Sequence, residues 1–126
     1  MPKKILIVDD DKVFSKILKD AFLAGGQGKY TVVAAFDGEE GFATAQREKP
    51  DLVMLDLVMP KMDGIGFLRA LRAESWGVEL PVIMETGMDD FKKMSDGVEL
   101  GVRGYIIKTD YSIEAVLRQV GDILKV

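Results

Sequence analysis

The sequence contains no cysteine and no histidine among its 126 residues. Without cysteine there are no disulfide bonds, thiolate metal sites or cysteine nucleophiles, and the composition fits a reducing, cytoplasmic location. Without histidine there is no Ser-His-Asp triad, no histidine-liganded zinc ion and no imidazole base. Any acid–base or metal chemistry must therefore use carboxylates, lysine, tyrosine or hydroxyl groups.

The sequence also lacks long apolar runs and a positive net charge. No segment approaches the roughly 20 apolar residues that cross a bilayer, so we expect no membrane association. The formal net charge of −4 argues against direct nucleic-acid binding, which favours a basic surface. With 48% hydrophobic residues the chain can bury a core, and its length suits one domain over residues 1–126.

Short apolar runs alternate with segments of helical periodicity along the chain. We predict strands near residues 5–8, 30–36, 52–55, 80–84 and 105–107, and helices within 13–22, 38–49, 65–71, 89–100 and 113–124. Asp11, Asp37 and Ser112 stand where helix N-caps are expected, and Gly97 weakens the fourth helix. Five such units predict a three-layer, doubly wound α/β fold with a five-stranded parallel sheet. Its functional crevice should lie at the carboxyl ends of the strands.

Charged and hydroxyl side chains follow four of these predicted strands. They are Asp9-Asp10-Asp11 after the first strand, Asp56 after the third, Glu85-Thr86 after the fourth and Lys108 after the fifth. Carboxylates in one crevice repel one another unless a cation compensates them, and Lys108 and a hard divalent cation are the natural candidates. Mg²⁺ prefers a few carboxylates together with water and phosphate oxygens. With an aspartate nucleophile and a hydroxyl donor, these groups suit transfer of a phosphoryl group onto Asp56.

Four segments of the chain, in this order, resemble the motifs of receiver domains of two-component response regulators. They are Ile7–Asp11, Leu55–Gly64, Val82–Gly87 and Gly104–Lys108. The resemblance covers essentially the whole chain. It implies a flavodoxin-like sheet with the strand order 2-1-3-4-5.

The resemblance implies a phosphoacceptor and a metal site. Asp56 would accept the phosphoryl group and would also bind Mg²⁺ together with Asp9, Asp10 and the backbone carbonyl of Val58. Such a domain catalyses its own phosphorylation and its own dephosphorylation, without a separate substrate that it turns over. Because the chain has no histidine, a histidine kinase or a histidine phosphotransfer protein would supply the phosphoryl group.

The resemblance also implies a conformational switch. Lys108 would pair with the phosphoryl oxygens, Thr86 would donate a hydrogen bond to them, and Tyr105 would then turn inward. The added charge of about −1.5 to −2 would shift the balance between two packings. The output face would comprise the fourth helix, the fifth strand and the fifth helix, and would bind a downstream protein target or form a homodimer. The sequence given has no DNA-binding or catalytic output domain after Val126, so we expect output through a protein contact unless the chain is a fragment of a longer regulator.

The chain departs from the family pattern at three positions. Thr109 follows Lys108 where most receivers have proline, so we predict a trans peptide bond and an altered loop, in which Asp110 is near enough to compete for Lys108. Val58 and Met88 are apolar where the family's residues flank the path of the hydrolytic water. Neither can orient water by a hydrogen bond, which predicts slow self-dephosphorylation.

Three other interpretations compete with a phosphorylated receiver. A pseudo-receiver would keep the fold and bind a partner without phosphorylation. A haloacid-dehalogenase-like phosphatase would need a second acid two residues after Asp56, where Val58 stands. A flavodoxin would need hydroxyl groups and glycines after the first strand, where the chain has three aspartates.

Overall fold

The computed structural model describes residues 1–87 and 91–126. Strands and helices alternate along these residues. They are β1 (Lys3–Val8), α1 (Lys12–Gly25), β2 (Tyr30–Ala35), α2 (Gly38–Glu48), β3 (Leu52–Asp56), α3 (Gly64–Arg72), β4 (Val82–Thr86), α4 (Phe91–Glu99), β5 (Gly104–Ile107) and α5 (Ile113–Leu124).

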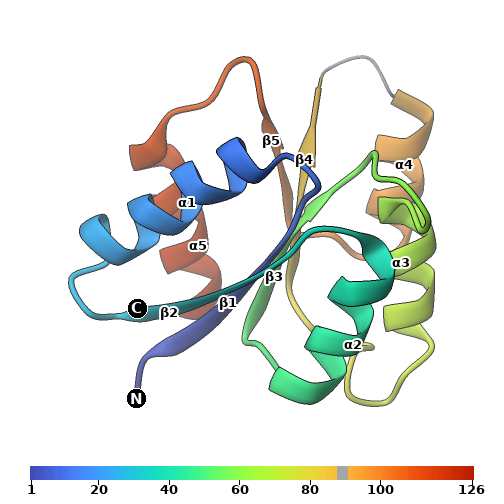
Figure 1. The fold of residues 1–126 in the computed structure, drawn as a ribbon, viewed down its shortest axis with the longest axis horizontal. Helices are drawn as coiled ribbons and strands as arrows, with labels where there is room; N and C mark the ends of the chain where they lie inside the picture. The colour runs from blue at the N-terminus through green and yellow to red at the C-terminus, as the bar shows by residue number, and fades with distance from the viewer. Residues whose placement is uncertain (88–90) are drawn as a thin grey trace.

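The strands form one parallel sheet in the order β2-β1-β3-β4-β5. Helices α1 and α5 cover one face, and α2, α3 and α4 cover the other (Figure 1). This confirms the predicted three-layer, doubly wound, flavodoxin-like α/β fold and its strand order. Because the strands are parallel, their carboxyl ends lie along one edge of the sheet, and those of β4 and β5 are at the top of Figure 1.

The central strands are buried on both faces, as their continuous apolar runs predict. Residues Ile5–Val8 of β1 and Leu52–Leu55 of β3 have no exposed surface. Successive side chains of β1 point to opposite faces of the sheet and contribute to two separate hydrophobic cores. Leu6 and Val8 pack with α2 and α3, whereas Ile5 and Ile7 pack with α1 and α5. The ends of these strands are therefore fixed positions from which polar side chains can project.

Several helices begin at side-chain caps. Asp11 accepts hydrogen bonds from the Val13 and Phe14 amides, and Asp37 and Ser112 cap α2 and α5, as predicted. Asp63 also caps α3 by accepting a hydrogen bond from the Gly66 amide. The chain therefore enters α1 directly from the acidic end of β1, through a carboxylate that is already used in capping.

Two elements near the end of the sheet, β4 and α4, differ from the prediction in their bounds. Strand β4 begins at Val82 rather than residue 80 and continues through Thr86, so that Glu85 and Thr86 lie inside the strand. Helix α4 begins at Phe91, and the predicted start at Asp89 lies outside the described residues. None of the helices in the described part of the chain has both the length and the apolar character needed to cross a membrane.

Candidate functional site

Three aspartates converge at the carboxyl edge of the sheet. Asp9 follows β1, Asp10 follows it, and Asp56 ends β3; each offers a carboxylate oxygen within 4.8 Å of the others. Asp9 and Asp56 are 0% and 5% exposed, whereas Asp10 is exposed to solvent. Adjacent central strands bring the three together although 46 positions separate Asp10 from Asp56 in the sequence (56 − 10). These hard oxygen donors, one of them open to solvent, fit a cation that keeps part of its water shell.

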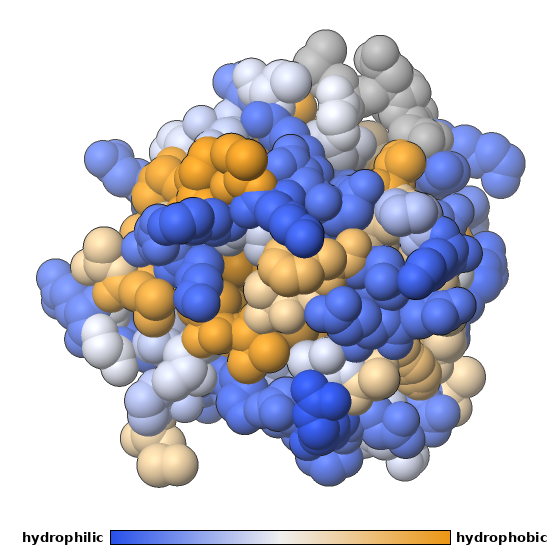
Figure 2. Space-filling model, in the orientation of Figure 1, coloured by the Kyte–Doolittle hydropathy of each residue, from blue (hydrophilic) through white to orange (hydrophobic). Residues whose placement is uncertain are grey.

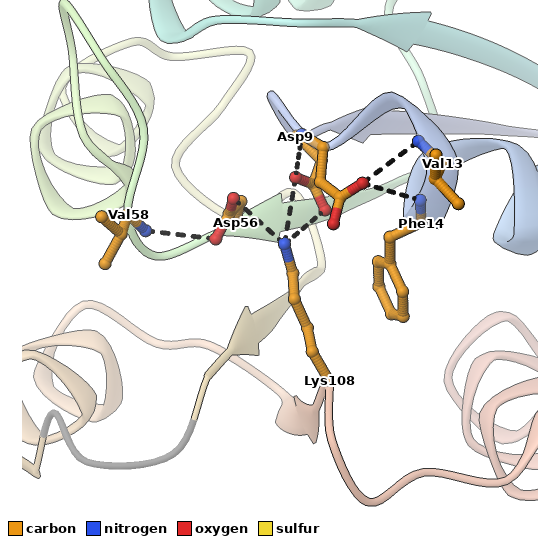
Figure 3. A network of polar contacts seen from close by, with 7 residues as sticks. Asp9, Val13, Phe14, Asp56, Val58 and Lys108 are labelled. Atoms are coloured by element: carbon orange, nitrogen blue, oxygen red, sulfur yellow. Dashed lines mark hydrogen bonds and ion pairs between the residues drawn. The ribbon is translucent and has the colours of Figure 1, made fainter.

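Lys108 projects into this cluster from the end of β5 (Figure 3). Its Nζ lies 3.1 Å from Oδ1 and 2.9 Å from Oδ2 of Asp9, and 3.2 Å from Oδ2 of Asp56. Lys108 therefore forms ion pairs with both Asp9 and Asp56. Within the described residues it forms none with the exposed Asp110, which does not compete for it. The ammonium group compensates only part of the buried negative charge.

Backbone amides hold the two buried aspartates in place. The Asp11 N–H donates to Oδ1 of Asp9 at 2.8 Å, and the Val58 N–H donates to Oδ1 of Asp56 at 3.2 Å. Val58 is 59% exposed, and in Figure 3 its amide rather than its side chain faces Asp56. The carbonyl of Val58 was predicted to bind the metal, but this contact of its amide with Asp56 was not predicted.

The electrostatics of the cluster separate the two aspartates. Burial raises the pKa of Asp56 to about 7, and the nearby charge of Asp9 acts in the same direction. Burial would also raise the pKa of Asp9, but its polar neighbours, which are the Glu85 and Asp56 carboxyls, the Asp11 amide and Lys108, hold it below its ordinary value. Burial would lower the pKa of Lys108, but its contacts with the carboxylates raise it. Asp9 is thus the stable anion of the cluster, whereas Asp56 carries a destabilised charge.

A fourth carboxyl group lies beneath the cluster. Glu85 is 0% exposed, and burial followed by its contacts with Asp9 raises its pKa well above the ordinary value. In β4 it pairs in register with Asp56 of β3. From the sequence, Glu85 was predicted at the strand end, with no role in the site. An ionised carboxylate is costly to bury, but an acid that directly follows an apolar run gives no sign that it lies inside the strand.

Thr86 and Tyr105 occupy the neighbouring strands. Thr86 is 1% exposed at the end of β4, and its carbonyl accepts a hydrogen bond from the Lys108 N–H at 2.8 Å. Tyr105 is half-buried, and its hydroxyl donates to the carbonyl of Met94 in α4. Gly97 of α4 is buried against the Tyr105 ring, and a Cβ at this position would collide with the tyrosine hydroxyl. The glycine that weakens α4 is therefore what allows Tyr105 to pack inward.

The connection after Lys108 has the predicted trans peptide bond to Thr109. It is a tight turn in which the Asp110 N–H donates to the carbonyl of Ile107 at 3.0 Å. The turn leaves Lys108 directed toward Asp9 and Asp56, so the missing proline does not divert the ammonium group. Met88, to which the sequence analysis assigned a part in slow dephosphorylation, lies outside the described residues.

The family model of the response regulator receiver domain matches residues 5–118 of the chain. The chain belongs to this family. Its relatives include a probable transcriptional regulator, ycf27, of Porphyridium aerugineum, which is 41% identical over 94% of the chain and 48% of the relative. The alkaline phosphatase synthesis transcriptional regulatory protein PhoP of Bacillus subtilis is 36% identical over 94% of the chain and 50% of the relative. The receiver thus spans about half the length of these curated relatives.

Solved receiver structures share the fold over the whole chain. The chemotaxis protein CheY4 of Vibrio cholerae superposes with a TM-score of 0.87 at 28% identity, covering 98% of this chain and 99% of that one. A putative response regulator of Chloroflexus aurantiacus gives a TM-score of 0.89 at 28% identity, with complete coverage of both chains. The chain is thus a receiver domain of the two-component response regulators, and it has a buried acidic cluster where receivers bind Mg²⁺.

Proposed function

We propose that this receiver is a phosphorylation-activated switch in which Asp56 accepts the phosphoryl group. The observation that carries the proposal is the shared contact of Lys108 with Asp9 and Asp56, 3.2 Å from the Asp56 carboxylate. A carboxylate nucleophile needs a cation nearby to draw in an anionic donor, and Lys108 provides it from the end of β5, two strands away from β3. One domain over residues 1–126 would contain the whole site.

The acidic trio suits Mg²⁺ as the cofactor of this reaction. Asp9, Asp10 and Asp56 would hold the ion, with the Val58 carbonyl as a further ligand, because the three carboxylates lie within 4.8 Å of one another. When bound, Mg²⁺ supplies charge stabilisation to the phosphoryl oxygens. The residues of the chain do the rest: Asp9 keeps Lys108 in place through its low pKa, and Val58 orients the Asp56 carboxylate through its amide.

The donor would be a phosphohistidine on a histidine kinase or a phosphotransfer protein, because the receiver has no histidine of its own. In this step an Asp56 carboxylate oxygen forms a bond to phosphorus, the bond from phosphorus to the histidine nitrogen breaks, and that nitrogen keeps the electron pair. Exposed apolar side chains on α1 beside the site, Val13 and Ile17, offer surface to a protein donor. Hydrophobic surface is visible on the α1 side of the molecule in Figure 2.

The output would pass through the face formed by α4, β5 and α5. Thr86 lies between the acidic cluster and Tyr105, because β4 is the strand between β3 and β5. A phosphoryl group on Asp56 would attract Thr86 and Lys108, and the packing of Tyr105 on Gly97 would respond. A downstream protein or a second copy of the chain would read this face. The named relatives are transcriptional regulators about twice as long, so such a target could also be a domain of the same protein.

The experiment that tests this proposal is labelling with phosphoramidate, with and without Mg²⁺, followed by intact-mass measurement. We expect one phosphoryl group on the wild-type protein in Mg²⁺ and none on Asp56→Asn. Asp110→Asn is the matched control, because Asp110 is an exposed acid near Lys108 in the chain, and it should be labelled normally. An unlabelled wild type would instead support a pseudo-receiver, as would the lack of any thermal response to beryllofluoride with Mg²⁺.

A further inference from the structure

Lys108 has a neighbour that the charge network does not include. Its Nζ lies 5.1 Å from the centroid of the Phe14 ring. This distance is within the range at which an ammonium group is attracted to the negative face of an aromatic ring. In the view of Figure 3, Asp56 lies on one side of the ammonium group and Phe14 on the other. The cation is therefore held by carboxylates and by an aromatic ring.

The position of Phe14 is fixed by the same short segment that fixes Asp9. Phe14 is 6% exposed in the first turn of α1, and its amide donates to the Asp11 carboxylate at 3.0 Å. The Asp11 amide in turn donates to Asp9 at 2.8 Å. The spacing between the ring and the Asp9 carboxylate is thus set by local hydrogen bonds, and Lys108 is held between the two.

The loop that carries Lys108 also supports the ring. Tyr111, three residues after Lys108, meets Phe14 in an edge-to-face contact, with ring centroids 5.2 Å apart and planes at 85°. Lys108 and Tyr111, both in the β5–α5 connection, therefore contact the Phe14 ring of α1. These contacts join the connection to α1 in a chain that has Thr109 after the lysine, where most receivers have proline.

We propose that Phe14 is a positioning residue for Lys108, held in place by Tyr111. The inference rests on the proposed function, since its consequence is a faster phosphorylation of Asp56. Asp56 loses its negative charge to the new bond with phosphorus, so Asp9 and the Phe14 ring are the contacts of Lys108 that do not change during the reaction. The Phe14 ring makes no covalent change in this step and continues to hold the cation over the pocket.

The test replaces Phe14 by mono-, di- and trifluorinated phenylalanine. Fluorine weakens the negative face of the ring stepwise and barely changes its shape, so packing is retained while the attraction for a cation declines. We expect the rate of labelling by subsaturating phosphoramidate in Mg²⁺ to fall along the series, by about 3- to 30-fold in total. A rate that does not change along the series overturns the proposal.

Phe22 is the matched control for this series. It is a buried phenylalanine of the same helix, 1% exposed, with an edge-to-face contact to Tyr30 at 5.4 Å. Among the described residues no ammonium or guanidinium group lies over its ring. Fluorination of Phe22 should therefore leave the labelling rate unchanged. An equal loss of rate in both series would show an effect of packing alone and overturn the proposal.

A second measurement does not depend on phosphorylation. The ring current of Phe14 should shift the side-chain methylene protons of Lys108 upfield in the NMR spectrum, in a signal that is identified by its loss in Lys108→Met. Phe14→Leu should abolish the shift, and Tyr111→Leu should reduce it. Wild type that is labelled, with no such shift, contradicts the positioning role alone. Wild type that takes no label contradicts the proposed function itself.

Discussion

The two ends of the strands differ in how their charged side chains are compensated. The guanidinium group at the amino ends is satisfied by backbone carbonyls, whereas the carboxylates at the carboxyl ends share a single ammonium group. At the amino ends, the Arg72 guanidinium donates to the backbone carbonyls of Leu100 and Gly77 at 2.7 Å, of Leu80 at 2.8 Å and of Gly101 at 3.3 Å. At the carboxyl ends, the Asp9 and Asp56 carboxylates share the Lys108 ammonium. Arg72 joins two connections, α3–β4 and α4–β5, whereas the aspartates lie close together in one pocket.

The difference separates a group that stabilises the fold from groups that serve a reaction. Charged hydrogen bonds to backbone carbonyls stabilise the native state. Carboxylates close together and out of water destabilise it unless a cation is bound, as the raised pKa of Asp56 indicates. Removal of a charge should therefore have opposite effects on stability at the two ends.

The largest effect should follow Arg72→Met. This change leaves the carbonyls of Gly77, Leu80 and Leu100 without their charged donor, and we expect a loss of about 3 kcal/mol in the free energy of unfolding. Urea denaturation, followed by the fluorescence of Trp76, would measure it. Trp76 is the only tryptophan and stacks on Phe42 with centroids 5.7 Å apart, so it reports on this part of the fold.

Arg69→Met is the control for Arg72→Met. Arg69 lies one turn earlier in α3 and is exposed, so its loss should cost less than about 0.5 kcal/mol. Arg72→Met should still accept a phosphoryl group on Asp56 under conditions in which it is folded. Equal destabilisation by the two substitutions would show that the hydrogen bonds of Arg72 do not stabilise the amino-end connections.

An effect of opposite sign should follow Asp56→Asn in the absence of divalent cations. The folded-state pKa of Asp56 is about 7, above its ordinary value, so between about pH 4 and pH 7 the native state holds more protons than the unfolded state. The contribution of Asp56 to stability is thus lost as the pH rises through this window. Asp56→Asn lacks this loss and should exceed wild type by about 1–2 kcal/mol at pH 8, and by little at pH 4.

Urea denaturation in EDTA across this pH range would measure the difference. Mg²⁺ should then reverse the order at pH 8, because wild type offers a carboxylate ligand that the asparagine variant lacks. Asp110→Asn, at an exposed position near Lys108, should give a pH profile parallel to that of wild type. If Asp56→Asn were less stable than wild type at every pH in EDTA, the buried charge of Asp56 would not destabilise the native state.

Much of the acidic end could be predicted from the sequence. The runs Ile5–Val8 and Leu52–Leu55 are apolar because they are buried on both faces, and this indicates a parallel sheet whose strand ends share one edge. Asp9 and Asp56 follow those runs directly, so their approach needs only adjacent strands. The order of the strands came from the resemblance to receivers, since periodicity alone does not specify which strands are neighbours.

The contacts that were missed depend on packing between distant segments. Glu85 is buried because β4 extends to Thr86. An acidic residue that follows an apolar run looks the same in the sequence whether it is the last part of the strand or lies beyond it. The hydrogen bonds of Arg72 join two connections, α3–β4 and α4–β5, whose approach no local sequence pattern reveals. Gly97 indicated only a weak helix, because its partner Tyr105 lies in the next strand.

The smallest effect concerns the lifetime of the proposed acyl phosphate. Val58 is 59% exposed, two residues after Asp56, and its apolar side chain cannot orient a water molecule toward that carboxylate. Val58→Asn keeps the backbone amide that contacts Asp56 and adds a hydrogen-bonding group, so we expect decay about five-fold faster, the equivalent of one net hydrogen bond. The measurement is the loss of radiolabel from phosphorylated protein in Mg²⁺.

Val78→Asn is the control, because this valine is 53% exposed in the connection before β4, at the Arg72 end, where a polar group should not affect the decay. If Val58→Asn decays no faster than wild type, or if Val78→Asn is accelerated equally, the apolar character of Val58 does not protect the phosphoryl group.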